Sequence, residues 1–274
     1  MGTDMGSSYS EQYRAQVTAF FDGRTQYDNE TTIQRALPLL DLVPLLPGQR
    51  VLDIATGTGI IAISAAQKVG ETGAVVGVDI SNGMLTQAQQ KIDELGLQNI
   101  ELMEVDAETV EFSNCTFDAV FCSSALVYLA DIPGALKNWY RWLKPGGAIA
   151  FSAWSENSYT TPLIMDVCRR HGIALLNINE PTGTVDKCFN LLESVGFKDV
   201  EVTEEQQGHY IPLKSAVRWN GAWFHPTCNP LADLGKETIA RLIADYQRAV
   251  KNKANDEGVW CEKAAYYAMG RKPL

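Results

Sequence analysis

Three aspartates lie where apolar runs are interrupted or end, and their carboxylates could hold a polar ligand. Asp53 lies inside a short apolar run, Asp79 closes the run A-V-V-G-V-D, and Asp106 directly follows I-E-L-M-E-V. A carboxylate inside an apolar strand is costly to bury without partners. A carboxylate at a strand end can accept both hydroxyls of a ribose. The three acids therefore predict a site for a nucleoside-like ligand.

A glycine turn follows the first of these acids. The stretch R-V-L-D-I-A-T-G-T-G places Gly57 and Gly59 between a buried run and an apolar helical pattern. A strand, a Gly-x-Gly turn and a helix form the first half of a nucleotide-binding βαβ unit. Glycine lets the backbone approach a ligand closely, although the same turn also occurs for packing alone.

The elements that position these residues alternate regularly. Ser81 and Asp131 are N-cap candidates, while Gly70 and Gly96 end helical patterns. Alternation of this kind predicts a parallel sheet with helices on both faces, whose strands all end at one edge. The five expected strands are 51–54, 74–79, 100–105, 117–123 and 148–154.

The remaining segments predict two further strands and a lid. Strands are expected at 198–206 and 261–273, with an amphipathic helix from Val185 to the stop at Gly196. Helices at 9–21 and 31–46 precede the first strand and could cover the ligand edge. We therefore expect one domain over residues 1–274. Its parts are N-terminal lid helices (1–47), a binding core (48–154) and a completing segment (155–274) with lid insertions at 155–183 and 213–258, the second carrying a helix over 231–250.

The composition indicates which kinds of binding partner and which cellular compartment to expect. The net charge of −10 leaves no excess of Lys and Arg for nucleic-acid phosphates. No apolar run reaches the ~18 residues that a membrane span needs, and the N-terminus lacks the features of a secretory signal. Six scattered cysteines predict buried free thiols, and three histidines without ligand spacing predict no metal site. A cytoplasmic protein is expected, while the oligomeric state stays open.

Five motifs together resemble the class I S-adenosylmethionine-dependent methyltransferases. They are V-L-D-I-A-T-G-T-G, V-D-I-S-N-G-M-L, V-D-A-E, F-D-A-V-F-C-S and L-K-P-G-G, in the family's order over residues 48–154. Their spelling is most similar to ubiquinone and menaquinone C-methyltransferases and to natural-product methyltransferases. The final A-M-G-R-K-P resembles the family's last strand. The resemblance implies an α/β fold with a Rossmann-like, doubly wound, seven-stranded sheet whose last strand is antiparallel.

The resemblance also implies roles for individual residues toward S-adenosylmethionine. Asp53 would face the methionine end, Asp79 the ribose, and Asp106 with the Ala107 amide the adenine. Met84 would pack on the adenine face or belong to the core. Arg24 could pair with the cofactor carboxylate. The implied cofactor-binding residues are Tyr27, Asp53, Ala55, Gly57, Gly59, Asp79, Ile80, Met84, Asp106, Ala107 and Ser123.

The acceptor side is less defined. Methyl transfer is an in-line displacement for which positioning can supply much of the catalysis, and a base is needed only for a protonated acceptor. Tyr128 and His225 are the catalytic candidates, with His209 as a second possible base. Aromatic residues of the expected lid could form an acceptor pocket or pack against one another: Trp154, Tyr159, Trp219, Trp223 and Phe224. The partner expected there is a small, apolar or aromatic methyl acceptor.

Three alternatives stay open. Gly57 to Ala62 also satisfies G-x-G-x-x-A with an acid about 20 positions later, as in NAD(P)-dependent oxidoreductases. Asp53 within its strand, V-D-A-E and K-P-G-G favour the methyltransferase. An arsenite methyltransferase would need a different set of cysteines. A catalytically silent binding module would keep the same motifs without a closed acceptor pocket.

Overall fold

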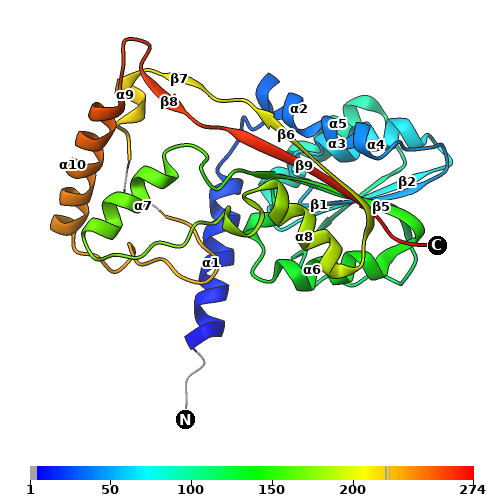
Figure 1. The fold of residues 1–274 in the computed structure, drawn as a ribbon. Coiled ribbons are helices and arrows are strands. Elements are labelled where there is room, and N and C mark those ends of the chain that lie inside the picture. The colour runs from blue at the N-terminus through cyan, green and yellow to red at the C-terminus, as the bar shows by residue number, and fades with distance from the viewer. Residues whose placement is uncertain (1–4, 220, 222) are drawn as a thin grey trace.

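The computed structural model describes residues 5–219, 221 and 223–274, and its centre is a seven-stranded sheet (Figure 1). The strand order is β3-β2-β1-β4-β5-β9-β6, and β9 pairs antiparallel with both of its neighbours. The strands are β1 (Arg50–Ile54), β2 (Ala74–Asp79), β3 (Ile100–Glu104), β4 (Phe117–Ser123), β5 (Leu143–Trp154), β6 (Lys198–Gln206) and β9 (Ala264–Arg271). The predicted Rossmann-like sheet with an antiparallel last strand is confirmed.

Helices cover both faces of this sheet because its strands are apolar on both sides. One face packs against α6 (Ile132–Trp142) and α8 (Val185–Val195), with the fully buried Trp139 and Trp142 in the core. The other face packs against α3 (Pro38–Leu42) and α4 (Ile60–Val69). The helix α5 (Asn82–Leu95) follows β2.

The predicted helix ends are largely confirmed. The Ser81 side chain accepts a hydrogen bond from the Met84 amide at 3.2 Å, and Asp131 accepts one from the Gly134 amide at 3.0 Å. Gly96 ends α5 with a φ of +66°. These caps satisfy amide groups that have no partner within the helix.

Three expectations were wrong in detail. The single helix expected at 31–46 is divided into α2 (Glu30–Ala36) and α3, because Pro38 has no amide hydrogen to continue the helical ladder. All six cysteines are free, as predicted, but Cys115 is exposed and Cys228 is only partly buried. The last insertion helix also begins later than expected, as α10 (Lys236–Lys253).

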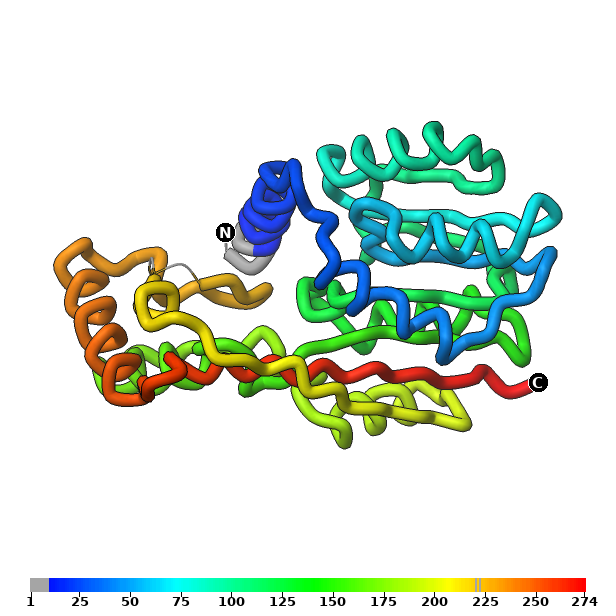
Figure 2. The backbone as a smooth tube through the Cα atoms, turned by 90° about the horizontal axis from the view of Figure 1, so that it is seen from above, coloured from blue at the N-terminus to red at the C-terminus, as the bar shows by residue number. Residues whose placement is uncertain are grey.

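The two insertions form a separate helical layer beyond the sheet. It contains α7 (Thr161–Arg170), α9 (Leu213–Ala216) and α10, with a small antiparallel sheet of β7 (His209–Ile211) and β8 (Val259–Cys261). These elements share their own apolar core. Figures 1 and 2 show this layer at the far end of β5 and β9, with α1 (Met5–Asp22) standing between it and the sheet.

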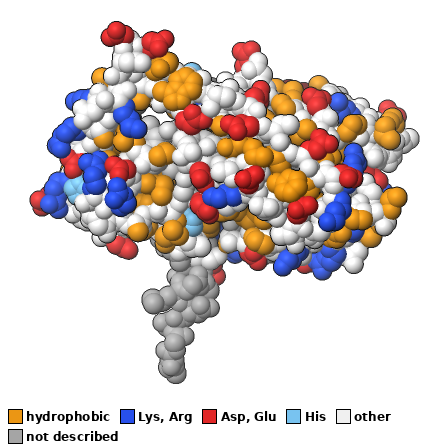
Figure 3. Space-filling view, in the orientation of Figure 1, with side chains coloured by type: hydrophobic (Ala, Val, Ile, Leu, Met, Phe, Trp, Pro, Cys, Tyr) orange, Lys and Arg blue, Asp and Glu red, His pale blue; other side chains and the backbone are white. Residues whose placement is uncertain are grey.

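The surface is unevenly charged although the chain carries a net charge of −10. Figure 3 shows Lys and Arg side chains gathered over the α10 end, while Asp and Glu are spread over the rest of that face. Within the part of the chain that the structure describes, no helix has the length and apolarity needed to cross a membrane.

The central strand β4 should carry much of the stability. Phe121 is 0% exposed, whereas Phe189 on α8 is 36% exposed. We predict that Phe121→Ala lowers the free energy of unfolding by about 3–5 kcal/mol, because it leaves a cavity in the core. The matched change Phe189→Ala should cost about 1 kcal/mol or less. Urea unfolding of both variants measures this; equal losses would place the stability elsewhere.

Candidate active site

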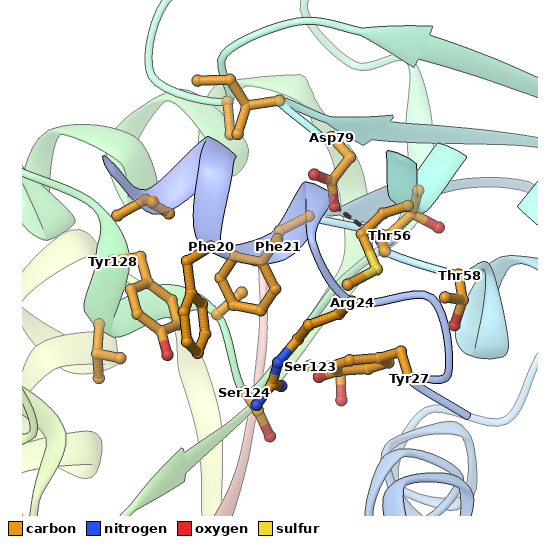
Figure 4. A pocket seen from close by; sticks show the side chains of 18 of the residues that line it. Phe20, Phe21, Arg24, Tyr27, Thr56, Thr58, Asp79, Ser123, Ser124 and Tyr128 are labelled. Atoms are coloured by element: carbon orange, nitrogen blue, oxygen red, sulfur yellow. Dashed lines mark hydrogen bonds between the residues drawn. The ribbon is translucent and has the colours of Figure 1, made fainter. Parts of the chain in front are cut away.

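A cavity of about 760 Å³ opens at the carboxyl ends of the parallel strands, under α1 and the loop that follows it (Figure 4). This is the edge at which ligands bind in open α/β sheets, and the volume suits a small organic molecule. Most of the residues predicted for the site line it: Tyr27, Asp53, Ala55, Gly57, Asp79, Ile80, Met84, Asp106, Ala107, Ser123 and Tyr128. Residues distant in the sequence are thus brought to one wall.

Asp53 is buried at the start of the glycine turn, with 1% of its surface exposed. Its carboxylate accepts hydrogen bonds from the Thr56 hydroxyl at 2.6 Å and the Ala62 amide at 3.1 Å. Burial raises the pKa of Asp53 to about 7, and these two donors oppose that rise. Asp53 therefore ties β1 to the first turn of α4 beneath the cavity.

Asp79 holds the same turn from the neighbouring strand. Its carboxylate accepts hydrogen bonds from the Gly57 amide at 2.8 Å and the Ser81 amide at 2.9 Å. Figure 4 shows Asp79 beside the turn, with its side chain directed into the cavity. Burial raises the pKa of Asp79, while the backbone donors oppose this. The remaining acceptor positions of a carboxylate can receive hydroxyl groups of a ligand.

The two glycines of the turn have different reasons to be glycine. Both have positive φ, +55° at Gly57 and +79° at Gly59. A Cβ at Gly57 would meet no described heavy atom within 4 Å, and this residue lines the cavity. A Cβ at Gly59 would lie 3.2 Å from the Cβ of Ala88. Gly59 is not among the described residues that line the cavity, so helix packing explains it better than the predicted ligand contact.

The predicted adenine end lies at the ends of β2 and β3. Met84 is 1% exposed yet lines the cavity, so it belongs to the core and to the wall together. Asp106 accepts a hydrogen bond from the Glu108 amide at 2.9 Å and forms an ion pair with Arg14 of α1 at 3.1 Å. The ion pair with Arg14, which the sequence did not predict, holds α1 over this end of the cavity.

The segment after α1 is fastened to the core by carboxylates. Asp22 accepts hydrogen bonds from the Ser81 hydroxyl at 2.6 Å and the Gly83 amide at 2.9 Å. A Cβ at Gly83 would lie 3.0 Å from the Asp22 backbone, so glycine is required for this approach. Asp28 accepts hydrogen bonds from the Thr58 hydroxyl and the Lys91 ammonium group. These contacts tie the segment between α1 and α2 to α5 and to the glycine turn.

Arg24 projects from this segment among aromatic rings. Its guanidinium carbon lies 4.7 Å from the centroid of Phe20 and 5.6 Å from that of Tyr27. Figure 4 shows the guanidinium group reaching toward Ser124, between the phenylalanines and Tyr27. Arg24 and Tyr27 thus lie together on the wall, as a site for the methionine carboxylate would require.

Tyr128 lines the cavity where β4 has ended. Burial, with a smaller contribution from Tyr27, raises the pKa of Tyr128 to about 12. Its hydroxyl therefore keeps its proton at neutral pH and can donate a hydrogen bond, but it is not a ready base. Ser124 lies beside it with a φ of +56° and hydrogen-bonds through its amide to the Ser152 hydroxyl at 3.0 Å. Strained backbone of this kind is often found at functional sites.

The histidines do not support the predicted catalytic role. His225 is not among the described residues that line the cavity, and burial lowers the pKa of its imidazole. Its Nδ1 accepts a hydrogen bond from the Thr227 amide at 3.2 Å. His209 is exposed on β7. The structure places His225 outside the lining of this cavity, and its role as a base stays a prediction.

A smaller cavity of about 230 Å³ adjoins the first. The two share Val17, Phe20, Phe21 and Tyr128, and Trp223 with Phe224 line the second alone. Trp154 and Tyr159 line the larger cavity, whereas Trp219 packs against Tyr246 with ring centroids 5.4 Å apart. The aromatic residues predicted for the lid thus divide into pocket wall and lid core.

Several lining residues escaped the sequence analysis. They are Arg14, Thr58, Ser124 and Arg35. Arg14 and Arg35 lie on amphipathic helices where an arginine ordinarily faces solvent. Ser124 directly follows the predicted Ser123, so its place after a strand end was a usable signal.

The buried carboxyl of Asp53 should make stability depend on pH. Its folded pKa of about 7 lies above the ordinary 3.8, so the folded state holds the proton that the unfolded chain releases. The contribution of this protonated carboxyl to the free energy of unfolding is fully present below about pH 4, and it is lost as the pH rises through 7. At ~1.4 kcal/mol per pKa unit, the free energy of unfolding of wild type should fall by roughly 4 kcal/mol over this pH range, relative to that of Asp53→Asn.

Urea unfolding at several pH values measures this difference. The change Asp41→Asn, at an exposed position of α3, controls for the loss of a charge. Parallel stability curves for wild type and Asp53→Asn would show that Asp53 is ionised in the folded protein throughout.

Comparison with known proteins gives relatives for the same region. A family model described as a methyltransferase domain matches residues 51–147. Aklanonic acid methyltransferase DauC of Streptomyces sp. (strain C5) is 38% identical over 156 residues, which cover 56% of this chain and 71% of that enzyme. The ubiquinone/menaquinone biosynthesis C-methyltransferase UbiE of Haemophilus ducreyi is 40% identical over 118 residues, which cover 43% of this chain and 46% of that enzyme.

A solved structure shows the same fold. The YcgJ protein of Bacillus subtilis superposes with a TM-score of 0.60 at 15% identity, covering 90% of this chain and all of that chain (100%). The match to DauC extends over 71% of that enzyme. The residues that the family model matches include the β1 turn, Asp79 and Asp106, which line the cavity. The chain belongs to the class I S-adenosylmethionine-dependent methyltransferases.

Proposed function

We propose that this protein transfers a methyl group from S-adenosylmethionine to a small, apolar or aromatic acceptor held under its lid. The observation that carries the proposal is the row of acids at three adjacent strand ends. Asp106 follows β3, Asp79 ends β2 and Asp53 lies in β1, and these strands lie side by side in that order. Together they match adenine, ribose and the amino end of the methionine portion.

The sheet order gives the direction of the bound cofactor. With adenine at β3 and the methionine portion at β1, the next strand along the edge is β4, followed by β5. The methyl group would therefore face the ends of β4 and β5, where Tyr128 and Trp154 line the cavity. The acceptor belongs on that side.

The residues present fit this cofactor. Gly57 leaves open space beside the turn, and Met84 offers a buried apolar surface next to the ribose-binding acid. Arg24 and Tyr27 lie together at the methionine end. S-adenosylmethionine supplies an electrophilic methyl group on a sulfonium, which is its own leaving group.

The protein's part is mainly positioning. The cavity wall excludes water and fixes the acceptor near the ends of β4 and β5, which can supply much of the rate enhancement. Tyr128 can donate a hydrogen bond to an acceptor oxygen because its phenol stays protonated. An acceptor that ionises in solution needs no protein base.

The lid and the relatives support a small-molecule acceptor. The smaller cavity is walled by Phe20, Phe21, Trp223 and Phe224, which suit an apolar ring. We assign its closure to α1 and to the insertions 155–183 and 213–258. The names of DauC and UbiE describe methyl transfer to aklanonic acid and in quinone biosynthesis, which is chemistry of the same class.

Ligand-induced stabilisation tests the cofactor directly. S-adenosylmethionine or S-adenosylhomocysteine at ~100 times its Kd should stabilise the protein by about 2.7 kcal/mol. NAD at the same concentration should have no effect, because the turn is held by Asp53 and Asp79 and offers no pyrophosphate site. A shift in melting temperature with NAD alone would favour the oxidoreductase instead.

The variant Asp79→Asn tests the ribose contact. Asparagine keeps an oxygen for the Gly57 or Ser81 amide but loses the charge that strengthens bonds to ligand hydroxyls. We expect the Kd for S-adenosylhomocysteine, measured by calorimetry, to rise about 10–100-fold. Asp41→Asn is the matched control, and the melting temperature without ligand reports the fold. Unchanged affinity would remove Asp79 from the site.

A further inference from the structure

Acidic side chains gather on one part of the cavity wall, where Arg14 is paired with Asp106, and two further arginines lie on another part. The carboxylates Asp53, Asp79 and Asp106 lie along the ends of β1 to β3. Two arginines, Arg24 and Arg35, line the opposite part. Among the described residues, neither arginine has a carboxylate oxygen within 4.0 Å of its guanidinium nitrogens. In a protein of net charge −10, two such cations on one cavity wall indicate anionic ligands.

The two arginines belong to different elements. S-adenosylmethionine carries a single carboxylate, and Arg24 lies beside Tyr27, on the segment between α1 and α2 that is fastened over the glycine turn. Arg35 lies one helix later, on α2, and faces the end of β5. Arg35 therefore stays available to the acceptor.

Arg35 is held in place for such a contact. Its Nε donates a hydrogen bond to the Thr31 carbonyl at 2.9 Å. Its guanidinium carbon lies 5.0 Å from the ring centroid of Trp154, the last residue of β5. The Tyr159 side chain is a further hydrogen-bond partner of the guanidinium. The remaining N–H groups are left for a ligand, and their planar arrangement suits a carboxylate.

Tyr159 adds a donor next to this guanidinium. Its φ of +60° is strained for an aromatic residue, and its amide donates a hydrogen bond to the Glu262 carbonyl at 2.6 Å. Burial raises the pKa of Tyr159, and Arg35 partly opposes that rise from close by. The ring centroids of Tyr159 and Trp154 are 5.9 Å apart. The fold thus presents a protonated phenol beside a fixed cation.

We infer that Arg35 and Tyr159 form a carboxylate-binding subsite for the methyl acceptor, which is then a planar aromatic acid. Arg35 supplies the charge, the Tyr159 hydroxyl supplies a hydrogen bond, and Phe20 with Phe21 wall the adjoining apolar cavity. The subsite lies beyond β4 from the cofactor-binding acids, on the side that the methyl group faces. This inference rests on the proposed function.

The test compares acids with their neutral amides. In the presence of saturating S-adenosylhomocysteine, calorimetry measures the Kd of 1-naphthoate and 1-naphthamide, and of anthraquinone-2-carboxylate and its carboxamide. Wild type should bind at least one acid about tenfold or more tightly than its amide, as expected for a charge-assisted pair. Arg35→Gln should abolish this preference, Arg35→Lys should keep part of it, and Tyr159→Phe should reduce it.

Two controls separate the possible failures. Arg248→Gln, on the exposed face of α10, should behave as wild type. The Kd of S-adenosylhomocysteine should stay within about twofold of wild type in Arg35→Gln, well below the tenfold that 1.4 kcal/mol would give. Equal binding of acid and amide, no binding of either pair, or loss of S-adenosylhomocysteine affinity in Arg35→Gln would overturn the subsite. Failure of wild type to bind S-adenosylhomocysteine would instead overturn the proposed function and the subsite with it.

Discussion

Two carboxylates from neighbouring strands hold the turn between β1 and α4, and the rest of the site is arranged around that turn. Asp53 fixes it from below through Thr56 and the Ala62 amide, and Asp79 fixes it from the side through the Gly57 amide. Each carboxylate is costly to bury, and each cost is partly offset by donors in the turn or next to it. The turn is therefore shaped by the protein alone, so a ligand meets a preformed surface.

The end of the cavity assigned to the methyl donor and the end assigned to the methyl acceptor are built differently. The methyl-donor end comes from consecutive βα units, in which each strand places one acid at a common edge. The acceptor end is assembled from distant pieces: α1, α2, the end of β5 and the inserted layer around α7 and α10. A family can vary the second set without disturbing the first. The family model accordingly matches the cofactor-binding end, at residues 51–147.

The same division explains how far the sequence alone could predict the structure. Strand order, helix caps and the line of acids follow from periodicity and from motifs a few residues long. The ion pair between Arg14 and Asp106 and the hydrogen bond from Ser81 to Asp22 join segments whose proximity is set by tertiary packing, which no local pattern encodes. His225 was a reasonable candidate by residue type, yet packing buries it away from the cavity wall. Residue type predicts chemistry well only where the backbone that places it is also predictable.

The account's central claim is the direction of the cofactor along the sheet edge, and a crystal structure of the complex with S-adenosylhomocysteine measures it most directly. The account predicts the adenine beside Asp106, the ribose hydroxyls on Asp79, and the sulfur directed toward Tyr128 and the ends of β4 and β5. A complex with the sulfur at the end of β3, or with the ligand outside this cavity, would contradict it.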